Sequence, residues 1–276
     1  HIDGCILTHS VSAALLVAEE SGADEVFIIG GGEIYRMGMP LTSKLYLRKK
    51  GLKFYESYSR LKKNKLPLVD AKIALSNDYY TGSKKRKWIT NNRSRKLTHL
   101  LRTKYHAILS TSKSINSDNS ILNCRIKGLE NKSPNLIIID RNLVIKKKLS
   151  IFKAIKNRKI YIYTTKNNKK KIKWLKKNNI QVVMMNKLNS KEDYNLLFKS
   201  LIKKGFSRIF IETGLTFINF LMSNKLLRNI YIFKTNFNLK NMGFNNSSNK
   251  LLKKIKLKNK LKVFLNNDNV YKERLN

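Results

Sequence analysis

Short runs of β-branched and other apolar residues alternate with helical patterns along most of the chain. After residue 66, the runs that predict strands are 68–75, 106–110, 136–140, 160–164, 180–185, 208–212, 230–233 and 261–265. The main predicted helices are 90–104, 193–204 and 216–223. Thr90 is the expected N-cap of the first, with Leu97, Leu100 and Leu101 on its inner face. Strands that alternate with helices through short links predict a three-layer α/β domain.

The first 47 residues show the same alternation on a smaller scale. Residues 10–21 place Val11 and Leu15 on one face of a helix, and 25–29 and 45–47 are short strand candidates. Residues 48–66 are basic, dotted with aromatic residues and without a clear period. We therefore expect a separate N-terminal piece (1–47), a connector (48–66) and a main domain (67–276).

Two segments combine a strand pattern, glycine and a helical pattern. They are residues 26–35 (VFIIGGGEIY) and 209–217 (IFIETGLTF). Glycine lets a ligand approach the backbone, and a helix N-terminus offers free N–H groups and a partial positive charge. Each segment is thus a candidate phosphate-binding corner, although tight packing of a strand against a helix produces the same pattern.

Charge divides the chain near residue 48. Residues 1–47 carry a net charge of −4 and the remaining residues carry +45, which together give the total of +41. The excess is mainly lysine, comes with many asparagines and isoleucines, and is spread evenly, which is typical of an AT-biased genome. Aromatic residues do not interleave with the basic runs as in a base-stacking surface. We expect no specific nucleic-acid partner.

The cysteines, the histidines and the hydropathy of the chain limit the classes of protein to which it can belong. Two cysteines, Cys5 and Cys124, predict no disulfide framework, and no histidine lies at metal-ligand spacing from either of them, so no metal site is expected. No apolar run reaches the roughly 18 residues that span a bilayer, and no basic signal-peptide start is present. A cytoplasmic protein is expected. The start at His1 indicates a fragment.

Several short motifs follow one another at characteristic spacing: residues 72–76 with Asp78, 88–90, 101–102 leading to 106–109, Asp118, Arg125, 137–140, and 211–212 with Gly214. On these motifs, residues 71 to about 272 resemble the reductase domain of the bifunctional riboflavin-biosynthesis deaminase-reductase. The resemblance implies a dihydrofolate-reductase-like three-layer α/β/α fold with a mixed central sheet. It also implies NADPH as cofactor, a phosphorylated pyrimidine as substrate and a possible homodimer.

Residues 1–47 resemble the latter half of dihydrofolate reductase, with its cofactor turn at Gly30, Gly31 and Gly32. The part of that family that carries the catalytic acid and the pterin pocket is missing, so no working dihydrofolate reductase is expected. The zinc deaminase motif of the bifunctional enzyme is also missing. The chain is interpreted as an artefact of joined sequences or a degenerate fusion, and a nucleotide-binding relic without activity is the alternative to a reductase.

The reductase resemblance assigns roles to particular residues. Substrate-binding candidates are Arg102, Leu122, Arg125 and Glu212, and Glu212 is the best candidate for a catalytic role. Cofactor-binding candidates are Ala74, Trp88, Ser114, Asp118, Gly214, Leu215, Thr216 and Phe217. A guanidinium fork suits a substrate phosphate because it can bind two oxygens at once.

Plainer interpretations stand beside these roles. Trp88 could be a core residue, Arg102 a solvated helix residue and Glu212 a capping acid, whereas His106 is expected to be structural. The chain also departs from the family pattern at Tyr79, Arg86, Asn119, Ser120, Arg141 and Thr213. Arg86 and Arg141 could add phosphate contacts or block the site.

Overall fold

The computed structural model describes residues 5–24, 26–28, 32–42 and 56–275, and for 154–157 only the backbone. Contacts within the chain define two compact units, His1–Phe54 and Tyr55–Asn276. Each unit is considered by itself below.

The described part of the N-terminal unit is helical. It contains α1 (Val11–Glu20), α2 (Gly32–Gly38) and a 3₁₀ turn, η1 (Met39–Leu41). Ser10 caps α1 through its side chain, which accepts from the Ala13 N–H at 3.0 Å. The strand expected over 25–29 is absent from its described residues, 26–28, and Phe27 is 62% exposed. The strand candidate at 45–47 lies outside the described residues.

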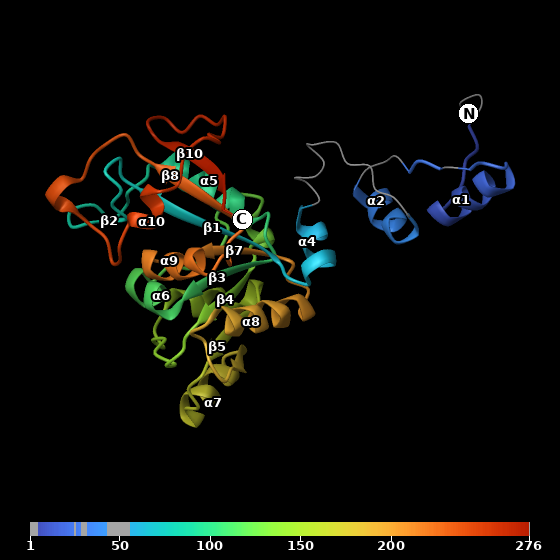
Figure 1. Ribbon diagram of the computed structural model, residues 1–276. Helices are drawn as coiled ribbons and strands as arrows, with labels where there is room; N and C mark the ends of the chain where they lie inside the picture. Colours follow the sequence, from blue (N-terminus) through green and yellow to red (C-terminus); the bar gives the residue numbers. More distant parts are fainter. Residues whose placement is uncertain (1–4, 25, 29–31, 43–55, 276) are drawn as a thin grey trace. The chain divides into compact units, whose positions relative to one another are not determined.

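The C-terminal unit is built on an eight-stranded sheet with the order β10-β8-β1-β7-β3-β4-β5-β6 (Figure 1). The strands are β1 (Leu68–Leu75), β3 (Ala107–Thr111), β4 (Asn135–Ile139), β5 (Ile160–Thr164), β6 (Ile180–Met184), β7 (Arg208–Glu212), β8 (Asn229–Lys234) and β10 (Asn269–Arg274). All neighbours pair in parallel except β10, which runs antiparallel to β8. The prediction of an α/β fold with a mixed sheet is confirmed.

Two hydrophobic clusters lie on opposite faces of this sheet. One joins Ile211 of β7 to Leu197 of α8 (Lys191–Lys203) and Ile218 of α9 (Leu215–Ser223). The other joins Phe210 of β7 to Leu101 of α5 (Asn92–Arg102) and also contains residues of α6 (Ser112–Asp118) and α7 (Lys169–Lys177). Because neighbouring side chains of a strand point to opposite faces, each central strand contributes to both clusters.

Shorter elements complete the unit. They are α4 (Glu56–Asn64), α10 (Lys250–Lys253), the strand pair β2 (Gly82–Ser83) and β9 (Gly243–Phe244), and the 3₁₀ helices η2 (Glu130–Lys132), η3 (Ser150–Asn157) and η4 (Lys240–Met242). Among the described residues, no helix is both long enough and apolar enough to cross a membrane.

Several local predictions were wrong. The expected strand at 261–265 is not formed, and β10 provides the last strand instead, because pairing with β8 selects a polar segment in which mainly Val270 and Glu273 are buried. The N-cap of α5 is Asn91, which accepts from the Ser94 N–H at 3.0 Å, and Leu100 is 39% exposed. Part of the expected irregular connector is the helix α4.

Candidate functional site

The site is built where β7 lies between β1 and β3. The chain reaches β7 only after it has formed β3, β4, β5 and β6, so β7 inserts between two strands that precede it by more than 90 residues. Ligands of open α/β sheets bind beyond the carboxyl ends of the strands at such a change of direction. Glu212 ends β7, and Thr213 and Gly214 lead directly into α9.

Glu212 forms a two-pronged ion pair with Arg102 of α5. The Nε of Arg102 donates to Oε1 at 2.6 Å and Nη2 donates to Oε2 at 2.9 Å, and each side chain is only 10% exposed. Lys72 of β1 is the register partner of Glu212 and lies next to this pair. Neither plainer interpretation holds, since Arg102 is not a solvated helix residue and Glu212 is not a helix cap.

The charges of the pair support each other. Burial by itself would raise the pKa of Glu212, but the charge of Arg102, its hydrogen bonds and the charge of Lys72 together lower that pKa below its ordinary value. Burial lowers the pKa of Lys72, and the nearby Glu212 opposes that shift. Glu212 is therefore ionised at neutral pH and lies among more positive than negative charge.

His99 connects Arg102 to the second candidate arginine, Arg125. The backbone N–H of Arg125 donates to His99 Nδ1 at 3.2 Å, and the Arg125 guanidinium lies 3.3 Å from His99 Nε2. Burial, with the charges of Arg102 and Arg125, lowers the pKa of His99 to about 4, so the ring is neutral at pH 7. The structure thus brings Arg102, Arg125 and Glu212 into one network, with Arg125 at its exposed end.

The corner after β7 carries a cluster of hydroxyl groups. Ser114 Oγ accepts from the Gly214 N–H at 3.1 Å and lies 3.0 Å from the Thr213 hydroxyl, and Thr111 Oγ1 lies 3.1 Å from Ser114 Oγ. These contacts fix the start of α6 to the start of α9. Thr213, a departure from the family pattern, is an integral part of this cluster.

The N-terminus of α9 has no side-chain cap, because its N-cap is Gly214. The helices α5, α6, α7 and α8 each have an N-cap side chain that accepts from the backbone. The first N–H groups of any α-helix have no carbonyl partner within the helix. In α9 the Phe217 N–H donates to the Gly214 carbonyl at 3.2 Å, which leaves the N–H groups of Leu215 and Thr216 available to an anion. The exposed Gly214 leaves room for an anion to approach.

The remaining candidate residues of this corner contribute differently. The side chains of Leu215 and Phe217 pack into the core beneath α9, so only their backbone groups are suited to a ligand. The Thr216 hydroxyl donates to the Asn246 carbonyl at 3.2 Å. Asp118 is exposed at the end of α6.

Three other candidates, Trp88, Ala74 and Leu122, have surroundings of their own. Trp88 is 53% exposed, which excludes the interpretation as a core residue, and Lys87 and Arg95 lie over its ring. Ala74 is on the same face of β1 as Lys72 and packs against the cluster beneath α5. The Leu122 side chain is buried in that cluster.

Departures from the family pattern mostly have structural explanations. Arg86 lies over the Phe237 ring at 4.7 Å, and Arg141 donates to the Leu188 carbonyl at 2.7 Å. Asn119 is the left-handed C-cap of α6, and its side chain accepts from the Ser150 N–H. Tyr79, where the family has glycine, has a φ of 66°, a value that glycine adopts more easily than tyrosine.

The sequence did not single out His99 or Lys72. His99 precedes Arg102 by three residues in the predicted helix, and that spacing places both on one face, so the signal was present. Lys72 belongs to a quoted family motif, but its neighbourhood depends on the pairing of β1 with β7. His106, expected to be structural, accepts from the Ser207 N–H at 3.2 Å.

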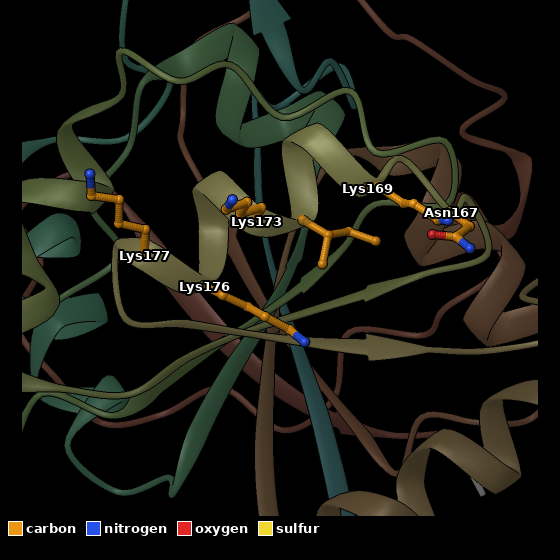
Figure 2. Close-up of a pocket in the computed structure, with 6 residues that line it drawn as sticks. Asn167, Lys169, Lys173, Lys176 and Lys177 are labelled. Atoms are coloured by element: carbon orange, nitrogen blue, oxygen red, sulfur yellow. The ribbon is translucent and has the colours of Figure 1, made fainter.

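A separate hollow runs along α7, at the opposite end of the sheet from β10 (Figure 1). It is open, has a volume of about 580 Å³ and is lined by Asn167, Lys169, Ile172, Lys173, Lys176 and Lys177. Figure 2 shows the Lys176 and Lys177 side chains extending away from the helix in different directions rather than converging on a centre. None of the candidate residues lines this hollow.

The fold and the corner define the class of the domain: a three-layer α/β domain with a mostly parallel sheet and a helix N-terminus without a side-chain cap at its centre. The family model described as the RibD C-terminal domain matches residues 67–235. The chain belongs to this family. A second model, described as dihydrofolate reductase, matches residues 1–56.

Individual relatives agree with the family. The chain is 30% identical over 158 residues to a protein of Buchnera aphidicola named 5-amino-6-(5-phosphoribosylamino)uracil reductase, covering 53% of this chain and 73% of the relative. Saccharomyces riboflavin biosynthesis reductase Rib7 has a similar structure (TM-score 0.60, 19% identity, 82% of this chain and 99% of the other). Acinetobacter baumannii RibD is also similar (TM-score 0.64, 18% identity, 80% of this chain), and the chain spans 62% of its length. At these identities the two structures show the shared fold.

Proposed function

We propose that this chain reduces 5-amino-6-(5-phosphoribosylamino)uracil to its ribitylamino product with NADPH, as a step of riboflavin biosynthesis. Membership of the RibD C-terminal domain family and the name of the Buchnera relative support this proposal. The single observation that carries it is the buried Arg102–Glu212 pair beside Lys72, two residues before the uncapped corner at Gly214.

The charge of the site suits a phosphorylated substrate. Arg102 and Arg125 bring two guanidinium groups to a network that contains a single carboxylate, Glu212, with the Lys72 amine beside it, while His99 is neutral. Arg102 already directs Nε and Nη2 to Glu212 and Nη1 to the Asn123 carbonyl at 2.7 Å. Arg125, at the exposed end, is therefore the better candidate for the substrate phosphate, and Arg102 would mainly orient Glu212.

The corner at Gly214 fits the pyrophosphate of a dinucleotide. Its free helix N–H groups and the absent side chain supply donors and room, and Ser114 fixes their position through the Gly214 N–H. When bound, NADPH would supply the hydride that converts the ribosyl side chain into a ribityl chain. The protein contributes positioning: Ser114 and the start of α9 would hold the cofactor.

Glu212 has two properties that suit a reaction through a cationic, imine-like transition state. It is ionised, and Arg102 fixes its carboxylate plane through two hydrogen bonds. Such a carboxylate can accept from substrate hydroxyls or stabilise positive charge without reorganisation.

The alternative, a nucleotide-binding relic, rests on the substitutions at Arg86 and Arg141. Arg86 lies over Phe237, and Arg141 is bonded to the Leu188 carbonyl. Within the described part of the chain, no hydrogen bond or ion pair joins either arginine to Ser114, Asp118 or Glu212. These placements support an open site and hence the reductase.

The experiment is a steady-state assay of NADPH oxidation with the ribosylamino substrate, repeated with NADH. We expect activity with NADPH and weaker binding of NADH, because the lysine-rich surface attracts the additional 2′-phosphate. Arg125→Ala should raise KM by about 10- to 100-fold, the effect of losing a hydrogen bond to a charged group. Arg93→Ala, an exposed arginine of α5, is the matched control and should leave KM unchanged.

A parent chain that oxidises no NADPH would contradict the proposed reductase function. Equal affinity for NADPH and NADH would contradict the proposed choice of cofactor. The proposal also includes a homodimer, which sedimentation equilibrium would test independently of activity.

A further inference from the structure

The loop between α6 and η2 carries Arg125 and is held by arginines. Three consecutive carbonyls, those of Ile121, Leu122 and Asn123, accept hydrogen bonds from guanidinium groups. Arg102 donates to the third of them. The first two accept from Arg158, which lies two residues before β5 and far from this loop in the sequence.

Arg158 is buried without a carboxylate partner. It is 7% exposed, its Nη1 donates to the Leu122 carbonyl at 2.7 Å and to the Pro134 carbonyl at 3.4 Å, and its Nη2 donates to the Ile121 carbonyl. None of the ion pairs among the described residues includes Arg158, and its buried Nε has no hydrogen-bond partner. Burial of an unpaired charge is unfavourable unless other groups compensate.

The electrostatic state of Arg158 is nonetheless clear. Burial, followed by the charge of Arg102, lowers the pKa of Arg158 to about 10, so the group is charged at neutral pH. Among the described residues, its hydrogen-bond partners are all backbone carbonyls, and two of those carbonyls belong to the loop. Leu122 has a φ of 56°, a left-handed conformation that a leucine rarely adopts without support from its surroundings.

We propose that Arg158 is a positioning residue for the substrate: it fixes the carbonyls of Ile121 and Leu122 and thereby places Asn123 for Arg102 and Arg125 for the substrate phosphate. This inference rests on the proposed reductase function. Arg158 itself touches neither substrate nor cofactor. It acts through the loop backbone, whose next carbonyl, that of Asn123, contacts Arg102, the partner of Glu212.

Three variants test this role. Arg158→Met removes the charge and the forked donors but keeps much of the volume. Arg158→Lys keeps the charge on a compact ammonium group but loses the planar fork of donors. Arg208→Met is the matched control, because Arg208 is also partly buried and also has an unpartnered buried Nε, but lies over Tyr105 at the start of β7. All three are compared with the parent in KM for the ribosylamino substrate, kcat and Kd for NADPH.

We expect Arg158→Met to raise KM by about 10- to 100-fold, a loss typical of displacements of about 1 Å remote from the chemistry. Kd for NADPH should stay at the parent value, Arg158→Lys should recover part of the loss, and Arg208→Met should keep the parent KM. An Arg158→Met protein that folds and keeps the parent KM would overturn the inference.

Hydrogen exchange gives a readout that does not depend on activity. The amides of Cys124 and Arg125 donate to Ser133 Oγ and His99 Nδ1, and we expect both to exchange faster in Arg158→Met while the amides of β4 keep their protection. If the parent is inactive, the proposed function fails, and this exchange still decides whether Arg158 positions the loop. If Arg158→Met does not fold, Arg158→Lys decides: faster exchange with raised KM supports the inference, and parent values of both overturn it.

Discussion

The two glycine segments of this chain look alike in sequence and differ in structure. Residues 209–212 belong to β7, a strand with β1 on one side and β3 on the other. Residues 26–28, the described part of the equivalent run, form no strand. A β-strand satisfies its backbone N–H and C=O groups only through neighbouring strands. An apolar run therefore predicts a strand reliably only where neighbouring strands are present to pair with it.

Burial follows the same division. Phe210 is fully buried in the second segment, whereas Phe27 of the first is largely exposed. The helix α9 after the second glycine buries Leu215, Ile218 and Leu221, while α2 after the first buries only Gly38. A strand–glycine–helix corner can bind a phosphate only if the strand and the helix hold it rigidly. Of the two segments, we therefore expect cofactor binding only at Gly214.

The largest expected difference between the two segments concerns the acids near their glycines, Glu212 and Glu33. Glu212→Gln keeps the shape and most hydrogen bonds but removes the charge, so kcat should fall by about 10²- to 10³-fold while Kd for NADPH is unchanged. Glu33 is exposed and forms an ion pair with Arg36, so Glu33→Gln is the control and should leave kcat unchanged. Full activity of Glu212→Gln would remove the catalytic role of Glu212.

A smaller difference is expected for the glycines. A Cβ at Gly214 would meet only Ser114 Oγ, at 3.6 Å, so Gly214→Ala should fold with the parent Tm. It would occupy the space above the free N–H groups and weaken NADPH binding by about 3- to 10-fold, the loss of one hydrogen bond. Gly32→Ala, which has open space around it, should leave Kd unchanged. Equal Kd values for NADPH in the parent and in Gly214→Ala would show that the cofactor does not bind at this corner.

Acid should weaken the C-terminal unit through His99. Its pKa is about 4 in the folded state and 6.5 ordinarily, so the unfolded chain binds more protons between these values. The stabilisation is complete above pH 6.5 and is lost as the pH falls toward 4, with a slope of at most about 1.4 kcal/mol per pH unit. His106 shifts in the same direction, because of burial and Arg208.

Urea unfolding across this pH window measures the effect. The free energy of unfolding of His99→Gln should depend less steeply on pH than that of the parent, by up to one proton. Identical slopes for both proteins would show that folding does not change the pKa of His99.

The smallest effect is expected from removal of the N-terminal piece. Deletion of residues 1–47 should leave the Tm of the remaining chain unchanged, because the division between the units falls at Phe54 and α4 is retained. The Glu56–Arg228 ion pair of 2.5 Å is also retained. Thermal unfolding of both proteins by circular dichroism measures this. A clear loss of Tm would show that the first 47 residues stabilise the domain.

Much of the C-terminal fold could be predicted because its central strands are continuous apolar runs. The limits of β5 and β7 were predicted to the residue. Strands buried on both faces carry nearly continuous apolar runs, here 160–163 and 209–211. The edge strand β10 was missed because only part of it is buried, and its pattern is therefore polar. The cap of α5 was misplaced by one residue because Thr90 and Asn91 are both good capping residues.

For the candidate site, the sequence by itself determined which residue types are present and that β1, β3, β7, α5 and α9 carry most of them. Only the tertiary structure decided that Arg102 pairs with Glu212, that Lys72 and His99 join them, and that Arg158 supports the loop before Arg125. Arg102 and Glu212, for example, are 110 positions apart in the sequence. Local patterns record burial and propensity, whereas partners across a sheet depend on strand order, which is settled when the whole core packs.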